Sequence, residues 1–193
     1  MSAMLDGLLQ ADQEFFLWLN GWHSPFWDAV MAAITYKFTW VPLYFALIYI
    51  LISHFKTKAF GYLLCIIAVV ALSDQIASGL FKPYFMRLRP CHDPVIGALV
   101  HLVKGCGGKY GFVSSHAATG FGIATSFNKL PFTKISHASW LYGWAFLYSY
   151  SRIYVGVHYP LDIAIGAIVG VLVGLLLVAA YRWSTRNSHS PYF

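Results

Sequence analysis

The chain has few charged residues. Asp, Glu, Lys and Arg make up 10% of its 193 residues and only seven are acidic, whereas 59% are hydrophobic. Soluble domains carry about 25% charged residues, and a soluble core of this size could not bury so much apolar surface. The scarcity of charge therefore excludes an ordinary soluble domain and predicts an integral membrane protein. The aromatic content of 18% supports this, because Trp and Tyr collect at membrane interfaces.

The charge that is present is unbalanced, with a formal net charge of +6. In a soluble protein such an excess would suggest nucleic acid as a partner. Here the basic residues gather in short loops between apolar runs. We therefore interpret them as topology signals or anion ligands, and expect membrane lipids rather than nucleic acid as partners.

Cysteine is also scarce, with three in the chain. Cys65 lies in an apolar run and is typical of a small core residue. Cys91 and Cys106 are fifteen positions apart in one loop, and either a disulfide or two free thiols fits them equally well. No cleavable signal peptide is expected, because the N-terminus lacks a basic segment and carries acidic residues.

Long apolar runs supply the fold prediction. We interpret five of them as membrane spans: 38–55, 59–81, 116–130, 135–151 and 160–183. The first two are long enough to cross a bilayer. Residues 5–22 have the spacing of an amphipathic helix lying on the membrane surface, and residues 24–36 suit a half-span or a second surface helix. The sequence thus predicts a single all-α domain over 1–193: interfacial helices at 1–36, a polytopic transmembrane bundle at 37–183 and a polar tail at 184–193, with five to six bundle helices in total. Gly166, Gly170 and Gly174 predict close helix packing in the last span.

Successive spans alternate in direction, so the 82–113 loop and the 151–160 turn should share one face. With Lys82, Arg89 and Arg152 set aside as ligands, that face keeps four basic residues: Lys37, Arg87, Lys104 and Lys109. The opposite face has six: Lys56, Lys58, Lys129, Lys134, Arg182 and Arg186. The positive-inside rule then places the opposite face in the cytoplasm. We expect a bacterial inner-membrane protein whose shared face is periplasmic.

Three clusters on the shared face carry candidate chemistry. In the first, Ser151-Arg152 precedes His158 and Asp162. Pro160 fits the first position of a helix, so Asp162 falls in the first turn and can fix the tautomer of the His158 imidazole, leaving the other nitrogen free to attack. Taken alone, the pair fits better as a helix cap and an acid that compensates the helix dipole.

The second cluster is Ser114-Ser115-His116, at the predicted start of a helix. The N-terminus of a helix attracts anions. His116 could donate a proton to a leaving group there, or it could be an ordinary interfacial histidine. The third supplies Lys82 and Arg89, which with Arg152 suit a phosphate. Snorkelling at the interface is the alternative for the basic residues, and we assign it to three of them: Arg87, Lys104 and Lys109.

Together the clusters resemble the type 2 phosphatidic acid phosphatase superfamily. Its signature is Lys, six residues, Arg-Pro; then Pro-Ser-Gly-His; then Ser-Arg, five residues, His, three residues, Asp. Lys82…Arg89-Pro90 and Ser151-Arg152…His158…Asp162 match fully. The middle element departs, with Val113 in place of Pro and Ser115 in place of Gly, which narrows the approach of phosphate to the backbone.

The resemblance implies a role for each matching residue. His158 would be the nucleophile that forms a phosphohistidine, Asp162 would orient it, and His116 would protonate the leaving oxygen and later activate water. Five residues would bind phosphate: Lys82, Arg89, Ser114, Ser115 and Arg152. It implies no metal or other cofactor, and a lipid phosphate as substrate. Undecaprenyl diphosphate, phosphatidylglycerophosphate, phosphatidic acid and a phosphate of lipid A all fit, and the sequence does not define the oligomeric state.

Alternatives to a lipid phosphatase remain at this stage. Haloperoxidases and soluble acid phosphatases share the signature, but the membrane spans disfavour both. A transporter or channel would use the intramembrane Asp74 and Gln75 as pore residues, and a catalytically inactive relative would only bind lipid. A carboxylate inside a span is a functional candidate, yet Asp74 lies about two turns before Lys82. We expect Asp74 to make a buried hydrogen bond or to act indirectly, by positioning residues that touch the substrate.

Overall fold

A computed structural model of the chain describes residues 2–130 and 138–187. Within these ranges the regular structure is helical and no strand is formed, which confirms the all-α prediction. The α-helices are α1 (Ser2–Asn20), α2 (Pro25–Thr35), α3 (Val41–Phe55), α4 (Ala59–Asp74), α5 (Lys82–Phe85), α6 (Ser115–Lys129), α7 (Trp140–Tyr154) and α8 (Pro160–Asn187). A 3₁₀ turn at Lys37–Trp40 joins α2 to α3. The first residues of the predicted 135–151 span lie partly outside the described ranges.

One helical segment extends further than predicted. A π-helix at Gln75–Phe81 continues α4 directly into α5, whereas we expected a loop from Lys82. The widened turns come just before Pro83, which has no N–H and whose ring would clash with the carbonyl four residues earlier in a regular α-helix. The π-helix avoids this clash, and Lys82 follows it directly as the first residue of α5.

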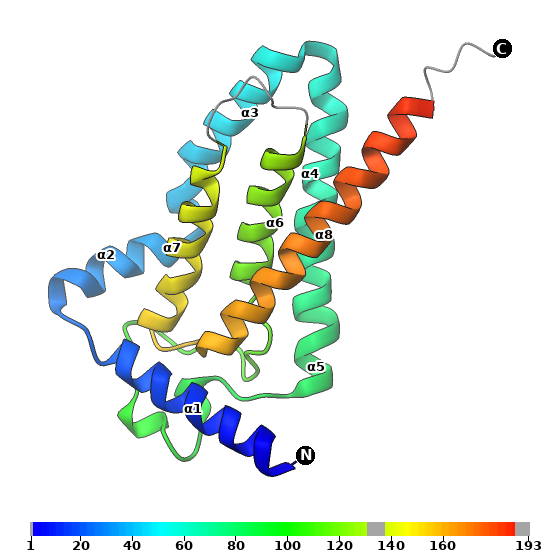
Figure 1. Cartoon of the computed structure of the whole chain (residues 1–193). Helices are drawn as coiled ribbons and strands as arrows, with labels where there is room; N and C mark the ends of the chain where they lie inside the picture. The colour runs from blue at the N-terminus through cyan, green and yellow to red at the C-terminus, as the bar shows by residue number, and fades with distance from the viewer. Residues whose placement is uncertain (1, 131–137, 188–193) are drawn as a thin grey trace.

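Helix α6 forms the centre of the bundle, with α4, α7 and α8 packed around it (Figure 1). The predicted glycines allow its closest contact. A Cβ on Gly166 would lie 2.6 Å from the Ser114 carbonyl oxygen, and one on Gly170 would overlap the Ala118 carbonyl oxygen. The backbones of α6 and α8 therefore touch directly, as small residues at this spacing permit. This contact sets the start of α8 against the start of α6.

The two ends of the bundle match the predicted alternation of spans. The chain reverses at Lys56–Lys58 between α3 and α4, at the end of the bundle where α8 finishes (Figure 1). The loop that follows α5 and the α7–α8 turn lie together at the other end, beside α1. The three signature clusters therefore reach one face, as the sequence predicted.

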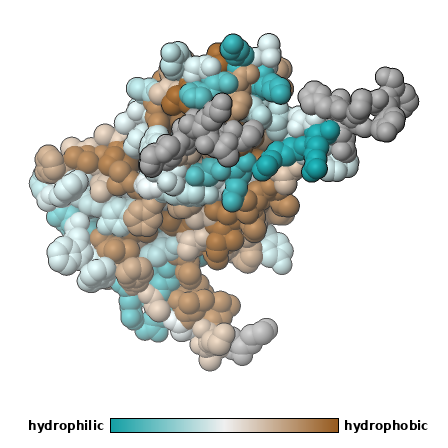
Figure 2. All heavy atoms as spheres, turned by 45° about the horizontal axis from the view of Figure 1, so that its top comes forward, coloured by the Kyte–Doolittle hydropathy of each residue, from teal (hydrophilic) through white to brown (hydrophobic). Residues whose placement is uncertain are grey.

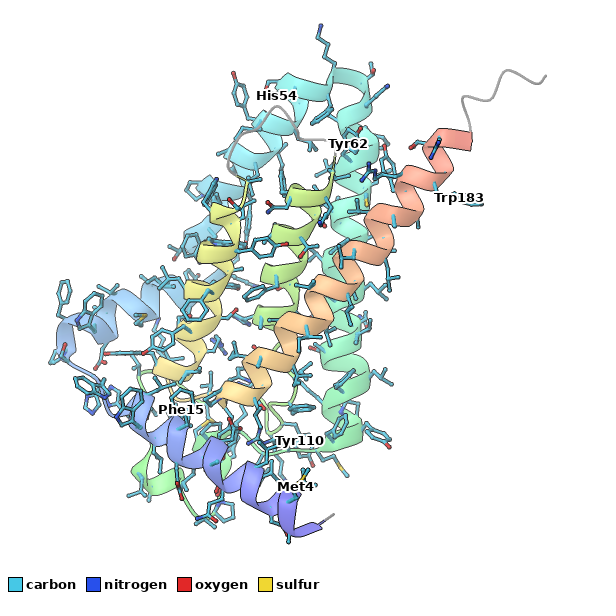
Figure 3. The ribbon with its side chains drawn as sticks, in the orientation of Figure 1. Met4, Phe15, His54, Tyr62, Tyr110 and Trp183 are labelled. Carbon is cyan, nitrogen blue, oxygen red and sulfur yellow. A yellow bond between two sulfur atoms is a disulfide. The ribbon has the colours of Figure 1, made fainter. Side chains whose placement is uncertain are left out.

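Helices α1 and α2 cover that face from outside the bundle (Figure 1). On α1 the side that contacts the protein carries Asp12, Phe16 and Asn20, all at most 5% exposed. The outward side presents large apolar residues such as Phe15 and Trp18, at 50% and 58% exposed (Figure 3). Aromatic residues at such a position suit the membrane interface. Helix α2 has only 11 residues and is about 16 Å long, so it cannot cross a bilayer.

Two segments are long and apolar enough to span a membrane by length and composition: Lys37–Phe85, which the turn at Lys56–Lys58 divides, and Pro160–Arg186. Helices α6 and α7 have 15 residues each. Helix α6 is central and presents mostly buried small residues, whereas α7 packs against it and exposes large apolar side chains such as Phe146. Hydrophobic atoms cover the flank of the molecule, below hydrophilic atoms at the forward end (Figure 2).

Candidate active site

His158 and Asp162 lie where α7 turns into α8. Pro160 begins α8 and Asp162 falls in its first turn, as the sequence predicted. The His158 Nδ1 atom is 3.2 Å from Asp162 Oδ2, and the two side chains are 2% and 0% exposed. Asp162 Oδ2 also accepts the Tyr159 N–H at 3.1 Å. With a proton on Nδ1 shared with the carboxylate, the Nε2 lone pair of His158 is free.

The second oxygen of Asp162 is held by Arg87. Arg87 Nη1 donates to Asp162 Oδ1 at 3.0 Å and Nη2 donates to Asp12 Oδ2 at 2.6 Å. The Arg87 guanidinium also lies 4.0 Å from the centroid of the Tyr159 ring. Its side chain is only 17% exposed. The interpretation of Arg87 as a snorkelling residue is therefore wrong: it connects the carboxylate behind His158 to α1.

Helix α1 is fixed at this point from both sides of Asp12. Asp12 Oδ1 accepts the Leu161 N–H at 2.9 Å, so the first turn of α8 and Arg87 share one carboxylate. A carboxylate at the start of a helix is favoured because it accepts unpaired N–H groups and meets the positive end of the helix dipole. Asp12, Arg87 and Asp162 thus form a chain of buried charges that ends at His158.

His158 is electrostatically disposed to be neutral. It lies in the loop between α7 and α8, outside both helices. Burial, then the positive charges of Arg152 and Arg89, hold the pKa of His158 well below its ordinary value. A neutral imidazole keeps the lone pair that a nucleophile requires.

Arg152 and Arg89 approach the pocket from different segments, and each is held by a neighbour. Arg152 Nη1 donates to Thr35 Oγ1 of α2 at 2.7 Å, while its buried Nε has no partner. Arg89 donates to two carbonyl oxygens of its own loop, that of Cys106 at 2.8 Å and that of Tyr110 at 3.3 Å. A bound phosphate could occupy the remaining guanidinium donors.

The loop that holds Arg89 is closed by a disulfide. Cys91 and Cys106 are joined, with 6.0 Å between their Cα atoms, so of the two sequence interpretations the structure has the bonded one. Cys65 is free and buried in the core, as expected. Because the Cys106 carbonyl accepts from Arg89, the covalent bond and the orientation of this arginine are connected.

Lys82 belongs to a polar chain at the end of the π-helix. Its Nζ donates to Ser115 Oγ at 3.0 Å and to Ser78 Oγ at 3.2 Å, and the two hydroxyls are 2.7 Å apart. Ser78 donates in turn to Asp74 Oδ1 at 3.3 Å. Asp74 therefore reaches Lys82 through Ser78 and also lines the pocket itself, and the indirect role expected for it remains a prediction.

The start of α6 presents His116 and Ser115 to the pocket. His116 stacks on Tyr148, with 4.9 Å between ring centroids. Ser114 is fully buried; its hydroxyl caps the helix by accepting the Ala117 N–H at 3.5 Å, and its own N–H donates to the Asp162 carbonyl oxygen. Ser115 and not Ser114 lines the pocket. A contact from Ser114 to phosphate remains a prediction.

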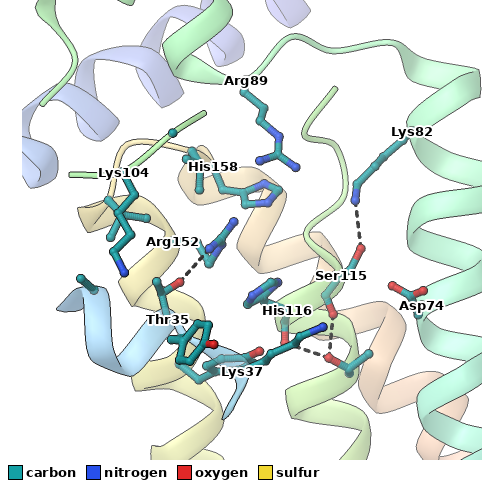
Figure 4. Close-up of a pocket in the computed structure, with 17 residues that line it drawn as sticks. Thr35, Lys37, Asp74, Lys82, Arg89, Lys104, Ser115, His116, Arg152 and His158 are labelled. Carbon is teal, nitrogen blue, oxygen red and sulfur yellow. Dashed lines mark hydrogen bonds between the residues drawn. The ribbon is translucent and has the colours of Figure 1, made fainter. Parts of the chain in front are cut away.

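These groups surround one cavity of about 570 Å³ (Figure 4). It brings together Lys82, Arg89, Ser115, His116, Arg152 and His158, with Asp74 at one side. It also contains four residues that sequence reasoning missed as functional: Thr35, Tyr36, Lys37 and Lys104. No motif marks them, because they come from the α2–α3 junction and the long loop and meet the site only in the fold.

A second cavity of about 440 Å³ lies between α3, α4 and α6. Its lining is almost entirely apolar, including Leu47, Ile67 and Ile123. Thr119 lines both cavities, so the polar pocket and the apolar cavity are neighbours. An apolar space beside a cationic one fits an amphiphilic ligand.

The arrangement defines a class of protein: a helical membrane protein with a buried histidine facing a cationic pocket. Comparison with known families agrees, because the PAP2 superfamily model matches residues 58–186. The chain belongs to the PAP2 superfamily and is a membrane lipid phosphatase.

Curated relatives narrow the similarity. A lipid A 4′-phosphatase of Bacteroides thetaiotaomicron is 41% identical over 97% of this chain and 85% of its own length. A second lipid A 4′-phosphatase, of Porphyromonas gingivalis, is 34% identical over 93% of this chain and 77% of its own.

Two solved structures have a similar architecture. The LpxE structure of Aquifex aeolicus matches with a TM-score of 0.63 and 26% identity, over 86% of this chain and 93% of that one. A phosphatidylglycerolphosphate phosphatase of Bacillus subtilis matches with a TM-score of 0.65 over 97% and 90%. At 22% identity this second match shows the shared fold.

Proposed function

We propose that the protein removes the 4′-phosphate of lipid A through a phosphohistidine on His158. The observation that carries the chemistry is the buried His158–Asp162 pair facing three cationic side chains in one pocket. The choice of lipid rests on the two similar lipid A 4′-phosphatases.

The first step transfers the phosphoryl group to His158. Lys82, Arg89 and Arg152 hold the phosphate oxygens and stabilise the charge of the transition state. His158 Nε2 forms the P–N bond while the bond from phosphorus to the sugar oxygen breaks, and His116 gives its proton to that oxygen. Asp162 stabilises the imidazolium character that develops on His158, as in other oriented-histidine sites.

The second step returns the enzyme to its starting state. His116, now neutral, accepts a proton from water as the water oxygen attacks phosphorus and the P–N bond breaks. Inorganic phosphate then leaves the pocket. In this proposal Ser115, 3.0 Å from Lys82 Nζ, donates a further hydrogen bond to the phosphate, while the buried Ser114 contributes by capping the start of α6. Neither step calls for a metal ion, so chelators should not affect the rate.

The location of the site supports substrate delivery from the membrane. The apolar cavity that shares Thr119 with the pocket gives an acyl chain a place beside the phosphate. The disulfide lies on the same face as the site, and disulfides persist in oxidising compartments. With the basic residues of the opposite face, this favours a periplasmic site in a bacterial inner membrane.

The test is phosphate release by the detergent-purified protein from a panel of lipids. The panel contains lipid A phosphorylated only at the 4′ position, lipid A phosphorylated only at the 1 position, undecaprenyl diphosphate, phosphatidylglycerophosphate and phosphatidic acid. We expect the 4′-phosphate to be released fastest and His158→Ala to release none. Preferred hydrolysis of another lipid would refute the substrate assignment.

The mechanism is tested separately with His116→Ala. A phosphate ester with an acidic leaving group needs no proton from His116, so the variant should accumulate a phosphoprotein that is stable in base and labile in acid. The matched control is His54→Ala, at an exposed position on the far end of α3, which should behave as wild type. Full activity of His158→Ala would rule out the phosphohistidine, and a transporter would keep its flux in that variant.

A further inference from the structure

The pocket contains more positive charge than one phosphate requires. Besides Lys82, Arg89 and Arg152 it is lined by Lys37 and Lys104, and its one carboxylate is Asp74. Five cations against one anion leave a formal excess of four charges, whereas a phosphate monoester carries at most two negative charges. The surplus corresponds to the two lysines that lie outside the family signature.

No Asp or Glu side chain in the described ranges forms an ion pair with these lysines. The chain has seven acidic residues, all within the described ranges, and no salt bridge joins any of them to Lys37 or Lys104 (the ion pairs of the described residues involve Arg87, His101 and His158). Lys104 Nζ lies 5.9 Å from the centroid of the Tyr36 ring, and Tyr36 directly precedes Lys37. Lys37 Nζ lies 5.1 Å from the centroid of the Phe38 ring, and the Tyr36 and Phe38 rings are 5.3 Å apart. Each of the two ammonium groups therefore lies beside a ring of the same short segment and, among the described residues, forms no salt bridge with an Asp or Glu side chain.

The backbones that carry both lysines are anchored to the catalytic arginines. Lys37 comes two residues after Thr35, which accepts the 2.7 Å hydrogen bond from Arg152. Lys104 comes two residues before Cys106, whose carbonyl accepts the 2.8 Å hydrogen bond from Arg89. Figure 4 shows Lys104 beside Thr35 and Lys37 below His116, and both lysines line the same pocket as Lys82. Their attachment points are thus fixed relative to the bound phosphate, although the side chains are exposed.

We propose that Lys37 and Lys104 form a second anion subsite that binds another negatively charged group of the same lipid substrate, such as a second phosphate. The inference rests on the proposed function for the identity of the lipid, but not for the subsite itself. Lysine suits this task because it binds an oxyanion as a point charge without fixed geometry. The substrate class is then a lipid with two separate anionic groups, one hydrolysed and one used for recognition.

The first experiment compares lipid A carrying both the 1- and 4′-phosphates with lipid A carrying only the 4′-phosphate. Wild type should prefer the doubly phosphorylated lipid in kcat/KM by about tenfold, through KM, as expected for two partly exposed charge contacts. The Lys37→Gln/Lys104→Gln variant should lose this preference. Lys56→Gln/Lys58→Gln removes the same charge on the opposite face and should keep it.

A second experiment does not depend on lipid A. Hydrolysis of the soluble substrate p-nitrophenyl phosphate is inhibited with alkyl monophosphonates and with alkane bisphosphonates of increasing spacer length. Wild type should bind one bisphosphonate about tenfold more tightly than the matched monophosphonate, and Lys37→Gln/Lys104→Gln should bind the two equally. If lipid A fails as a substrate but this difference persists, only the proposed lipid is wrong.

Two outcomes would overturn the subsite. One is an equal loss on mono- and bis-anionic ligands, which would mean general attraction of anions. The other is a lysine-dependent gain that appears only when anionic phosphatidylglycerol is added to neutral micelles, which would assign the lysines to neighbouring lipids instead.

Discussion

Arg87 should control the rate of the reaction without touching the substrate. It donates to Asp162, behind the nucleophile, and to Asp12 of α1, and it is not among the residues that line the pocket. In Arg87→Met the carboxylates of Asp12 and Asp162, 3% and 0% exposed, would lose their shared cation. Breaking a buried ion pair costs about 3–5 kcal/mol, and we expect the lower end because Arg87 keeps 17% of its exposure.

The kinetic effect should appear in kcat. A less firmly held Asp162 orients His158 poorly, and a loss of about 10–100-fold in kcat corresponds to about 1.4–2.7 kcal/mol of transition-state stabilisation. KM should change little, since the phosphate ligands remain. Steady-state kinetics and thermal unfolding in detergent measure both effects. A folded Arg87→Met protein with the kcat of wild type would refute the positioning role.

A double variant separates catalysis from stability. Asp12→Asn/Arg87→Met removes one of the two unpaired carboxylates, so part of the lost stability should return. The kcat should stay low, because Asp162 still lacks its cation. Recovery of kcat together with stability would show that Arg87 acts only through folding. Asp12→Asn alone, which keeps the 3.0 Å contact between Arg87 and Asp162, should affect kcat far less.

Three further predictions concern other parts of the molecule. Replacing both Cys91 and Cys106 by Ser should lower the free energy of unfolding by about 3 kcal/mol for a loop of this size. It should also raise KM, because the Cys106 carbonyl orients Arg89. A KM unchanged by the substitution or by reductant would contradict a connection between the disulfide and Arg89. Because the pKa of His158 is low in the folded protein, only the unfolded chain binds a proton at this residue below about pH 6.5. The melting temperature should therefore fall as the pH drops below that value and stay level above it. An equally steep fall in His158→Asn would show that other groups cause the pH dependence. Gly170→Ala should destabilise the α6–α8 contact by about 1–3 kcal/mol, whereas the control Gly143→Ala, which meets no atom within 4 Å, should be neutral or slightly stabilising; equal melting temperatures would argue against the tight contact.

The sequence predicted those parts of the site whose geometry is local. His158 and Asp162 are four residues apart at a helix start, so their contact follows from one turn of helix. The shared face of the three clusters followed from counting spans. The glycine spacing in 160–183 correctly predicted close packing against another helix.

What the sequence did not reveal depends on contacts between distant segments. Asp12 and Arg87 are 75 positions apart, and no short-range pattern connects them. Arg87 resembled an ordinary interfacial cation, because a basic residue in a loop has the same local signature whether it faces solvent or a buried carboxylate. The π-helix before Lys82 likewise accommodates Pro83, whose ring would clash with the preceding turn of a regular α-helix. The spacing of apolar residues does not reveal such a change.

The bond between Asp12 and the Leu161 N–H joins residues 149 positions apart. During synthesis α1 leaves the ribosome first and α8 last. The proposed phosphate ligands and the two proposed catalytic histidines precede α8 in the chain, but the carboxylate of Asp162 does not. A chain without its final helix lacks Asp162 and also lacks the backbone contact that packs α8 against α6. In the proposed mechanism the orientation of the attacking imidazole therefore depends on contact between the first and the last helix of the chain.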